Sequence, residues 1–195
     1  VLLRMADVAY MMENYTAMSE VCDKALHLDT SNLQTYLYYA KACRGLGEPI
    51  RAVAVLSLAI KLREDYYAAR LLRGTILLEN HILDDAAQDA DYLFTHLEPN
   101  EDVLLLKARV LKSQEKMKEA EQVYGMVIEV NPFSLDAYRE RYEVRTILGD
   151  AAGAAEDEAS IKEMGAEVPE PSEGIEQKIK EKMQQMDPYK VFHNE

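Results

Sequence analysis

The sequence predicts an all-α protein, an α-solenoid built from stacked helical hairpins. The main observation is an alanine that returns at a fixed period of 34, at Ala52, Ala86, Ala120 and Ala154, with the apolar Met18 one step earlier. The second is a set of glycine turns between the helices, and the third is Pro132, which marks the link from one unit to the next. A fixed period of this length is typical of helical repeats, because one hairpin buries its apolar face only against its neighbours.

The 34-residue grid divides the chain into one partial and four full helix-turn-helix units. Their expected bounds are 1–32, 33–66, 67–100, 101–134 and 135–168, and together they form a repeat array over residues 1–166. Small residues at the eighth and twentieth positions of a unit, such as Ala40 with Ala52, let the two helices approach closely. Gly47 and Gly149 provide turns between helices, and Pro132 marks the link from one unit to the next.

The fourth unit shows the repeat pattern most clearly. Its defining residues are Leu104, Ala108, Leu111, Ala120, Tyr124, Val127 and Pro132. This pattern resembles the tetratricopeptide repeat, W-x₂-L-G-x₂-Y…A-x₃-F…P. The resemblance implies a right-handed superhelix of about five repeats in which the first helix of each unit lines a concave groove.

Several charged residues occupy slots where the pattern has apolar ones. They are Arg70, Arg73, Lys107, Arg141 and Arg145. Because long basic side chains lay their stems on apolar surface, we expect their charged ends to remain in water. Four aspartates, Asp84, Asp85, Asp89 and Asp91, spread around one helix and are interpreted as a solvated acidic face.

The segment after the repeats has a different composition. Residues 167–174 are a predicted linker, since Pro169 and Pro171 do not fit within a helix. Residues 175–187 place Ile175, Ile179 and Met183 on one helical face, which predicts a capping helix for the stack, with a partner-binding helix as the alternative. Residues 188–195 form a tail.

The resemblance also implies which positions face the groove, namely the fifth, ninth and twelfth of each first helix. The fifth positions are Leu3, Leu37, Leu71, Leu105 and Arg139; the ninth are Asp7, Lys41, Thr75, Arg109 and Glu143; the twelfth are Tyr10, Arg44, Leu78, Lys112 and Thr146. The predicted partner-binding groove consists of Leu37, Lys41, Arg44, Leu71, Thr75, Leu78, Leu105, Arg109, Lys112 and Arg139.

The charge of these fifteen positions has the opposite sign to that of the chain. They hold five basic and two acidic residues, a net charge of +3 in a chain of formal net charge −13. A basic groove would attract an acidic or carboxylate-ended extended segment, and the leucine row would accept its apolar side chains. The alternative is that these cations pair with neighbouring carboxylates and have no binding role.

No catalytic, cofactor or metal site is expected. The four histidines are scattered without the i, i+4 spacing of a helical zinc site, and no phosphate loop or nucleophile elbow occurs. The carboxylate clamp that some tetratricopeptide proteins use for heat-shock chaperone tails is also not supported. The clamp positions hold Leu3, Asp7, Tyr38, Ala68 and Leu72 in one register, and Leu37, Lys41, Leu72, Asp102 and Leu106 in the next.

Composition restricts the partners further. A net charge of −13 argues against nucleic acid and anionic membrane surfaces, and no run approaches the about 18 apolar residues of a membrane span. Cys22 and Cys43 fall at positions that usually face inward, so we expect two buried thiols. The chain starts at Val1, from which we expect that an upstream segment, such as a signal, has been removed; a cytoplasmic location is the default.

The sequence therefore predicts a non-catalytic scaffold that binds a protein or peptide in its groove. The first unit would leave an apolar surface at Leu2, Leu3 and Met5, with Tyr10 and Met11. Self-assembly through terminal repeats, as a homo-oligomer, is therefore one alternative. A regulatory array within a larger protein is the other.

Overall fold

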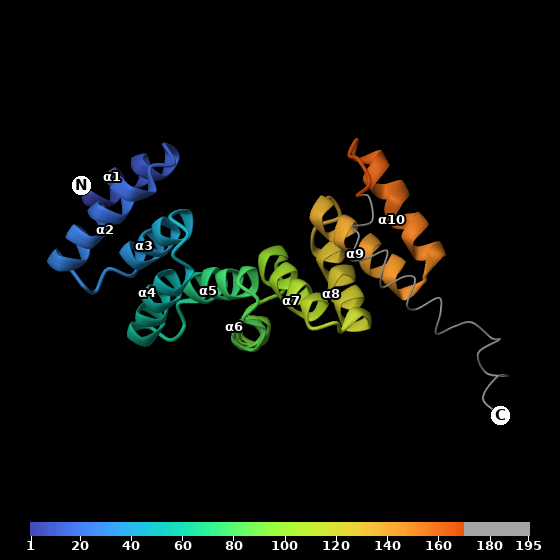
Figure 1. Ribbon diagram of the computed structural model, residues 1–195. Helices are drawn as coiled ribbons and strands as arrows, with labels where there is room; N and C mark the ends of the chain where they lie inside the picture. Colours follow the sequence, from blue (N-terminus) through green and yellow to red (C-terminus); the bar gives the residue numbers. More distant parts are fainter. Residues whose placement is uncertain (170–195) are drawn as a thin grey trace, which may run out of the picture. The chain divides into compact units, whose positions relative to one another are not determined.

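The computed structural model describes residues 1–169, and within this range the chain forms ten α-helices (Figure 1). They are α1 Leu2–Met11, α2 Tyr15–Leu28, α3 Leu33–Gly45, α4 Pro49–Leu62, α5 Tyr67–Glu79, α6 Leu83–His96, α7 Glu101–Ser113, α8 Met117–Val130, α9 Leu135–Leu148 and α10 Ala151–Glu163. The predicted capping helix at 175–187 and the tail lie outside the described residues.

The helices repeat with the period seen in the sequence. The first helices α3, α5, α7 and α9 begin at Leu33, Tyr67, Glu101 and Leu135, and the second helices α2, α4, α6, α8 and α10 begin at Tyr15, Pro49, Leu83, Met117 and Ala151. Each of these steps along the chain equals the spacing of the repeating alanine. The prediction of an all-helical array of helix-turn-helix repeats is confirmed.

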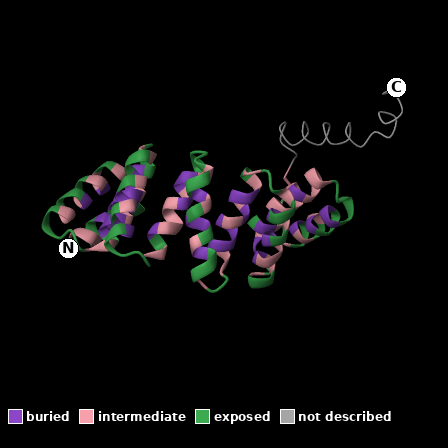
Figure 2. Ribbon diagram, turned by 90° about the horizontal axis from the view of Figure 1, so that it is seen from below, coloured by how far each residue is buried: buried purple, intermediate pink, exposed green. Residues whose placement is uncertain are grey.

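The helices belong to two compact units, an N-terminal unit from Val1 to Glu98 and a C-terminal unit that begins at Pro99. In the N-terminal unit each of α1 to α5 packs against the helix that follows it, and in the C-terminal unit each of α7 to α9 does so. Buried residues follow one face of most helices (Figure 2). Each hairpin therefore shares its apolar face with its neighbours in the same unit.

The repeating small residues are at the centre of this packing. Ala52, Ala86 and Ala120 are fully buried, as are Met18 and the first-helix Ala40. A side chain no larger than a methyl group lets the axes of two helices come close, and larger residues one turn away fill the remaining space. The expected role of the repeating alanine is thus confirmed by its burial.

The turn inside each hairpin contains a residue in the left-handed region. These residues are Glu13, Gly47, His81, Glu115 and Gly149, with φ between 53° and 78°, and each lies one repeat after the last. Gly47 and Gly149 adopt this conformation without a Cβ clash, whereas the other three are L-residues that adopt it at a cost. The turn geometry is therefore set by the repeat and not by glycine alone.

Side chains also start several helices. Asn14 and Asn100 accept hydrogen bonds from the backbone N–H groups of Ala17 and Val103, at 3.0 and 3.1 Å. Asp150 does the same for Gly153 at 3.0 Å. Such N-caps satisfy N–H groups that have no partner within the helix. None of the described helices is long and apolar enough to cross a membrane.

Candidate partner-binding face of the first helices

The predicted groove residues differ in how far they are exposed. Arg44 is exposed, and half-buried positions are occupied by Leu37, Lys41, Leu71, Thr75, Leu78, Arg109, Lys112 and Arg139. Leu105 is buried, with 7% of its surface exposed, and packs with Leu104 and Ala108 in the core of the C-terminal unit. Leu105 is therefore not available to a ligand, whereas the other predicted residues are at least partly exposed.

A small pocket lies on this face in the N-terminal unit. We call it the Lys41 pocket; it is lined by Tyr10, Tyr15, Lys41, Arg44, Gly45 and Leu72 and has a volume of about 270 Å³. Helices α1, α2, α3 and α5 each contribute to it. A Cβ atom at Gly45 would collide with the ring of Tyr15, so the glycine is needed for this wall of the pocket.

Lys41 points its ammonium group at aromatic rings. Its Nζ atom lies 5.1 Å from the ring centroid of Tyr10 and 5.9 Å from that of Tyr38. The Tyr38 hydroxyl donates a hydrogen bond to Asp7, which raises the pKa of Tyr38. Within residues 1–169, no carboxylate forms an ion pair with Lys41. Its contacts in this part of the chain are therefore with ring faces, which attract a cation weakly.

Arg44, the other cation of the pocket, has a carboxylate partner. Its Nε donates to Oε2 of Glu79 at 2.9 Å, and its Nη2 contacts Oε1 of the same carboxylate. The bidentate pair joins α3 to α5 across two repeats. Since both side chains are more than 40% exposed, an incoming anion could still compete for the guanidinium.

Arg109 and Lys112 are also paired with carboxylates, in the C-terminal unit. Arg109 donates to Glu140 at 2.7 Å and to Asp136 at 2.9 Å. Lys112 lies 3.4 Å from Glu140 and 3.3 Å from Glu143. These contacts join α7 to α9, so both cations of α7 serve the packing between adjacent repeats.

Glu140 is the centre of this network. It also accepts a 2.6 Å hydrogen bond from the buried hydroxyl of Tyr124. Burial alone would raise the pKa of Glu140, but the hydrogen bonds from Arg109 and Tyr124 and the charge of Lys112 hold it below its ordinary value. Burial, together with the Glu140 charge, raises the pKa of Tyr124. The carboxylate therefore stays charged and the phenol stays protonated at neutral pH.

Arg139, the last predicted groove residue, binds the backbone. Its Nη2 donates to the carbonyl oxygen of Glu167 at 3.1 Å, and its Nε is buried without a hydrogen-bond partner in the described part of the chain. The contact holds residues that follow α10 against α9. The carboxylates Glu79, Asp136 and Glu140 lie outside the fifteen first-helix positions but pair with the cations among them. Counting these three carboxylates reduces the net charge from +3 to zero.

Three residues of the Lys41 pocket were not among the predicted positions. Tyr15 begins a second helix, Gly45 ends a first helix, and Leu72 is the sixth residue of α5. Counting only the fifth, ninth and twelfth positions of first helices does not find them. Tyr15 could have been found from Gly45, because a glycine at a helix end often marks a close approach of a bulky neighbour.

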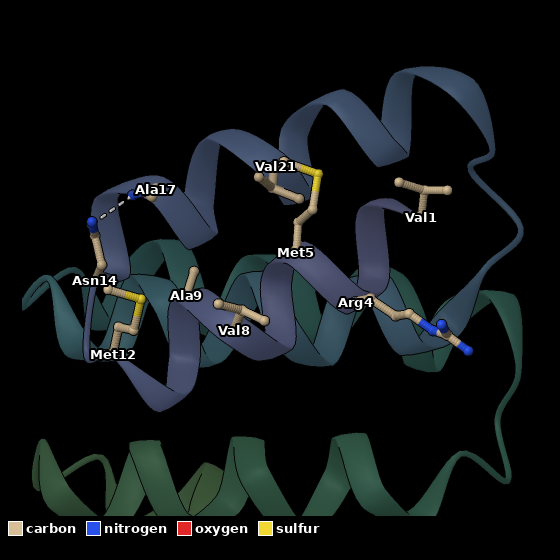
Figure 3. A pocket seen from close by; sticks show the side chains of 9 residues that line it. All are labelled: Val1, Arg4, Met5, Val8, Ala9, Met12, Asn14, Ala17 and Val21. Atoms are coloured by element: carbon tan, nitrogen blue, oxygen red, sulfur yellow. Dashed lines mark hydrogen bonds between the residues drawn. The ribbon is translucent and has the colours of Figure 1, made fainter.

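A larger, apolar pocket of about 540 Å³ lies on the first hairpin (Figure 3). Val1, Met5 and Val8 of the α1 segment and Val21 of α2 contribute to its walls. Its only charged lining residue is Arg4. None of its lining residues lines the Lys41 pocket.

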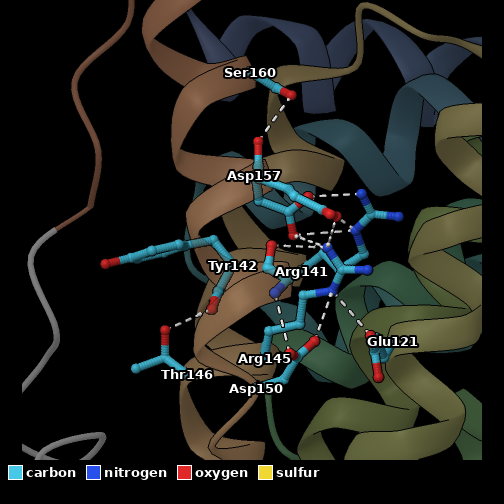
Figure 4. Close-up of polar contacts among 10 residues, drawn as sticks. Glu121, Arg141, Tyr142, Arg145, Thr146, Asp150, Asp157 and Ser160 are labelled. Carbon is cyan, nitrogen blue, oxygen red and sulfur yellow. Dashed lines mark hydrogen bonds and ion pairs between the residues drawn. The ribbon is translucent and has the colours of Figure 1, made fainter.

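Two buried aspartates correct the sequence interpretation. Asp89 is 1% exposed and binds Arg73 and Arg70, so it does not lie on a solvated face. Asp157, fully buried, binds Arg141 and Arg145 in the same manner (Figure 4). The expectation that these arginines keep their charged ends in water is wrong, because two guanidinium groups bind each of the buried carboxylates.

Neither of these buried carboxylates is placed to act on a substrate. Both are enclosed by side chains, and their oxygens are occupied by guanidinium groups. Within the described residues, no group of three or more His, Cys, Asp or Glu side chains could hold a metal ion. The cysteines Cys22 and Cys43 are free and buried, as predicted, and burial raises the pKa of the Cys22 thiol to about 12.

Comparison with known proteins supports the fold. A scan against protein-family models finds no match, and a search of curated proteins finds none that is similar. Solved structures do match. MamA 41-end from Desulfovibrio magneticus RS-1 has a TM-score of 0.78 and 14% identity, covering 84% of this chain and 93% of that chain.

Two further structures are similar over much of the chain. A tetratricopeptide repeat protein from Parabacteroides merdae has a TM-score of 0.73 and 19% identity, covering 94% of this chain and 72% of that chain. YrrB, described as a TPR protein with an unusual peptide-binding site, has a TM-score of 0.65 and 19% identity, covering 75% of each chain. At these identities the similarity shows the fold, which is that of tetratricopeptide-repeat proteins.

Proposed function

We propose that this chain, which has the tetratricopeptide-repeat fold, is a non-catalytic interaction module that binds an extended, acidic peptide segment at the Lys41 pocket. The observation that carries the proposal is the charge of Lys41, which faces the rings of Tyr10 and Tyr38 and forms no ion pair with a carboxylate within residues 1–169. An ammonium group beside a pocket recognises a carboxylate through up to three hydrogen bonds.

The size of the pocket favours one side chain as its occupant. Its volume of about 270 Å³ is below the range of about 300 to 1,000 Å³ that is usual for small-molecule sites. Leu72 and the ring of Tyr15 supply apolar contact, while Lys41 and Arg44 supply charge. An aspartate, a glutamate or a chain-terminal carboxylate of a peptide fits this combination.

The similarity to YrrB agrees with this proposal, since that protein is described as having a peptide-binding site. The basic residues of the C-terminal unit are not part of the proposed site. Arg109 and Lys112 are held by Glu140 and its neighbours, so a ligand would have to displace an internal carboxylate. The acidic preference is therefore assigned to Lys41 and, secondarily, to Arg44.

The test is a selection of random linear peptides displayed on phage against the full chain. We expect the selected peptides to be enriched in Asp or Glu, and Lys41→Glu to weaken their binding about tenfold or more, as for a charge-assisted hydrogen bond. Lys61→Glu is the matched control, because Lys61 is exposed near the end of α4 and does not line the pocket.

Two results would contradict the proposal. One is a set of selected peptides without acidic enrichment, and the other is equal binding to the wild-type chain and the Lys41→Glu variant. Reversal of Arg109 is less informative, because it would break the contacts with Glu140 and Asp136 and so alter the fold as well as the surface.

A further inference from the structure

The two units carry a pair of cations at equivalent positions of their first helices. Lys41 and Arg44 of α3 are followed two repeats later by Arg109 and Lys112 of α7, and α9 follows α5 by the same two repeats. In the C-terminal unit both cations bind Glu140 of α9, Arg109 at 2.7 Å and Lys112 at 3.4 Å. One internal carboxylate thus bridges the two cations of α7.

The N-terminal unit has a leucine at the position of this carboxylate. Leu72 of α5 stands two repeats before Glu140, and it lines the Lys41 pocket together with Lys41 and Arg44. The position therefore lies beside both cations in the N-terminal unit, as it does in the C-terminal unit. The two sites differ because a leucine stands in one where a bridging carboxylate stands in the other.

The groups that accompany Glu140 are replaced in the N-terminal unit as well. They are the carboxylates of Asp136 and Glu143, which bind Arg109 and Lys112, and the hydroxyl of Tyr124. The residues two repeats before these three are Ala68, Thr75 and Leu56. The N-terminal unit therefore keeps the two cations of the site without its acidic partners, and an anion from outside can supply the missing group.

We infer that a carboxylate of the bound peptide takes the place in the N-terminal unit that Glu140 takes in the C-terminal unit, where it bridges Lys41 and Arg44 beside Leu72. The inference rests on the proposed function, and it adds where the acidic group lies and which residue keeps the site open. The C-terminal unit contains the same site closed by its own glutamate. Leu72 is thus the residue that determines which of the two units admits a peptide.

The ion pair between Arg44 and Glu79 is compatible with this role. A guanidinium has five N–H donors, and the pair uses one at Nε and one at Nη2. Lys112, the equivalent of Arg44, lies within 3.4 Å of both Glu140 and Glu143. A cation at this position of a first helix therefore contacts two carboxylates at once, and Arg44 can bind a ligand while it keeps Glu79.

The probe is acetyl-Leu-Glu-Leu-amide, and acetyl-Leu-Gln-Leu-amide is its uncharged copy. Each is titrated to millimolar concentration into the full, isotope-labelled chain and followed by NMR, which detects weak binding and assigns it to one of the units. We expect the glutamate probe to shift the backbone amide signals of Lys41 and Arg44 and to leave those of Arg109 and Lys112 in place. The glutamine probe should bind about tenfold more weakly, because it lacks the charge.

Two variants at Leu72 test the position of the carboxylate. Leu72→Glu copies Glu140, and Leu72→Gln is its uncharged match, so both variants lose the same apolar contact. We expect the glutamate probe to bind Leu72→Glu about tenfold more weakly than Leu72→Gln, because a carboxylate within the chain competes at high effective concentration. Leu58→Glu and Leu58→Gln form the control pair. Leu58 is 54% exposed on α4 and does not line the pocket, so these two variants should bind the probe alike.

The reverse exchange opens the site of the C-terminal unit. One variant combines four changes that copy the N-terminal unit, Tyr124→Leu, Asp136→Ala, Glu140→Leu and Glu143→Thr. We expect the glutamate probe to shift the amide signals of Arg109 and Lys112 in this variant, in addition to those of Lys41 and Arg44. Circular dichroism measures its helical content and Tm, and the Leu72 pair decides the inference if the fourfold variant does not fold.

The outcomes separate this inference from the proposed function. If Lys41→Glu weakens binding of the glutamate probe but Leu72→Glu and Leu72→Gln bind it equally, the proposed function stands and the inference is overturned. A folded fourfold variant in which the signals of Arg109 and Lys112 do not respond overturns it as well. If the signals of Lys41 and Arg44 in the wild-type chain do not respond to the probe, the proposed function and the inference are both contradicted.

Discussion

Arg73 holds the carboxylate of Asp89 with two nearly parallel hydrogen bonds, of 2.8 Å from Nε and 2.7 Å from Nη2, although Asp89 is only 1% exposed. Arg141 and Asp157, two repeats later in the sequence, form the same contact in the C-terminal unit. The hairpins α5–α6 and α9–α10 thus join their two helices through a buried ion pair. In the first hairpin the equivalent residues are the apolar Met5 and Val21.

We expect the intact pair to contribute less to the free energy of unfolding than the removal of one partner takes away. Asp89→Val alone leaves the guanidinium groups of Arg73 and Arg70 without their carboxylate, and breaking a buried pair in this way costs about 3 to 5 kcal/mol. The double variant Arg73→Met with Asp89→Val carries the two residues of the first hairpin at these positions and should recover part of that free energy of unfolding, since Arg70 still lacks its carboxylate. Urea denaturation of the two single variants and the double variant measures the coupling.

The control for this cycle is Arg63→Met with Asp65→Val, a pair whose side chains are more than half exposed and 3.7 Å apart. Exposed ion pairs contribute about 0 to 1 kcal/mol, so these changes should have little effect. If Asp89→Val were as mild as Asp65→Val, the buried carboxylate would not be anchoring the hairpin. Additive effects of Arg73→Met and Asp89→Val would likewise contradict the coupling.

The helical hairpins could be predicted from the sequence, whereas the buried ion pair between Arg73 and Asp89 could not. The repeating alanine predicts the hairpins because helix separation depends on the size of one side chain, a property visible in the sequence at Ala52 or Ala120. The burial of Asp89 could not be predicted in this way. It depends on Arg73 of the facing helix, whereas the 34-residue repeat pattern describes each position without its partner on another helix.

The candidate site, likewise, could be predicted only in part from the sequence. Lys41 and Arg44 follow from their positions on a first helix, and both line the pocket. Arg109 is neutralised because Glu140 of the following repeat faces it, whereas Lys41 faces the rings of Tyr10 and Tyr38. Position within one repeat does not contain this information, since it depends on which residues the adjacent helices bring close.

The Glu140 network should make stability fall at acid pH. The pKa of Glu140 is lowered from 4.5 in the folded chain, so the unfolded chain binds the proton first as the pH falls. The stabilisation is therefore complete above pH 4.5 and is lost as the pH falls through the lower, folded value. Urea denaturation as a function of pH should show a smaller acid loss in Glu140→Gln than in the wild type.

Glu129→Gln serves as the matched control for that pH series. Glu129 is exposed on α8 and should leave the acid loss as it is in the wild type. An unchanged pH dependence in Glu140→Gln would show that the contacts with Arg109, Lys112 and Tyr124 do not favour the charged carboxylate. The wild-type and variant curves should also differ most at neutral pH, where the variant lacks the ion pairs entirely.

The thiols of Cys22 and Cys43 should be unreactive in the folded chain. Both are at most 1% exposed, and the pKa of Cys22 is raised to about 12, so the reactive thiolate is nearly absent at neutral pH. We expect the reagent DTNB to label them only as fast as the N-terminal unit opens, and quickly in denaturant. Rapid labelling without denaturant would mean that the core between α2 and α3 is open in solution.

The hairpin turns offer a way to stabilise the protein without touching its core. His81 has φ of 58°, in the left-handed region, and its side chain is exposed. An L-residue there costs about 1 to 2 kcal/mol, part of which a glycine recovers after its own loss of chain entropy. His81→Gly should therefore raise the free energy of unfolding by up to about 1 kcal/mol, or the Tm by about 2 to 4 °C.

The reverse change tests the same reasoning at the equivalent turn of α9–α10, the last hairpin within residues 1–169. Gly149 has φ of 78° and no atom near the place where a Cβ would stand, so Gly149→Ala introduces backbone strain without a steric clash. Thermal denaturation followed by circular dichroism should show a lower Tm for this variant. If His81→Gly lowered the Tm as well, the left-handed turn at His81 would not exist in solution, because only that conformation favours glycine over histidine.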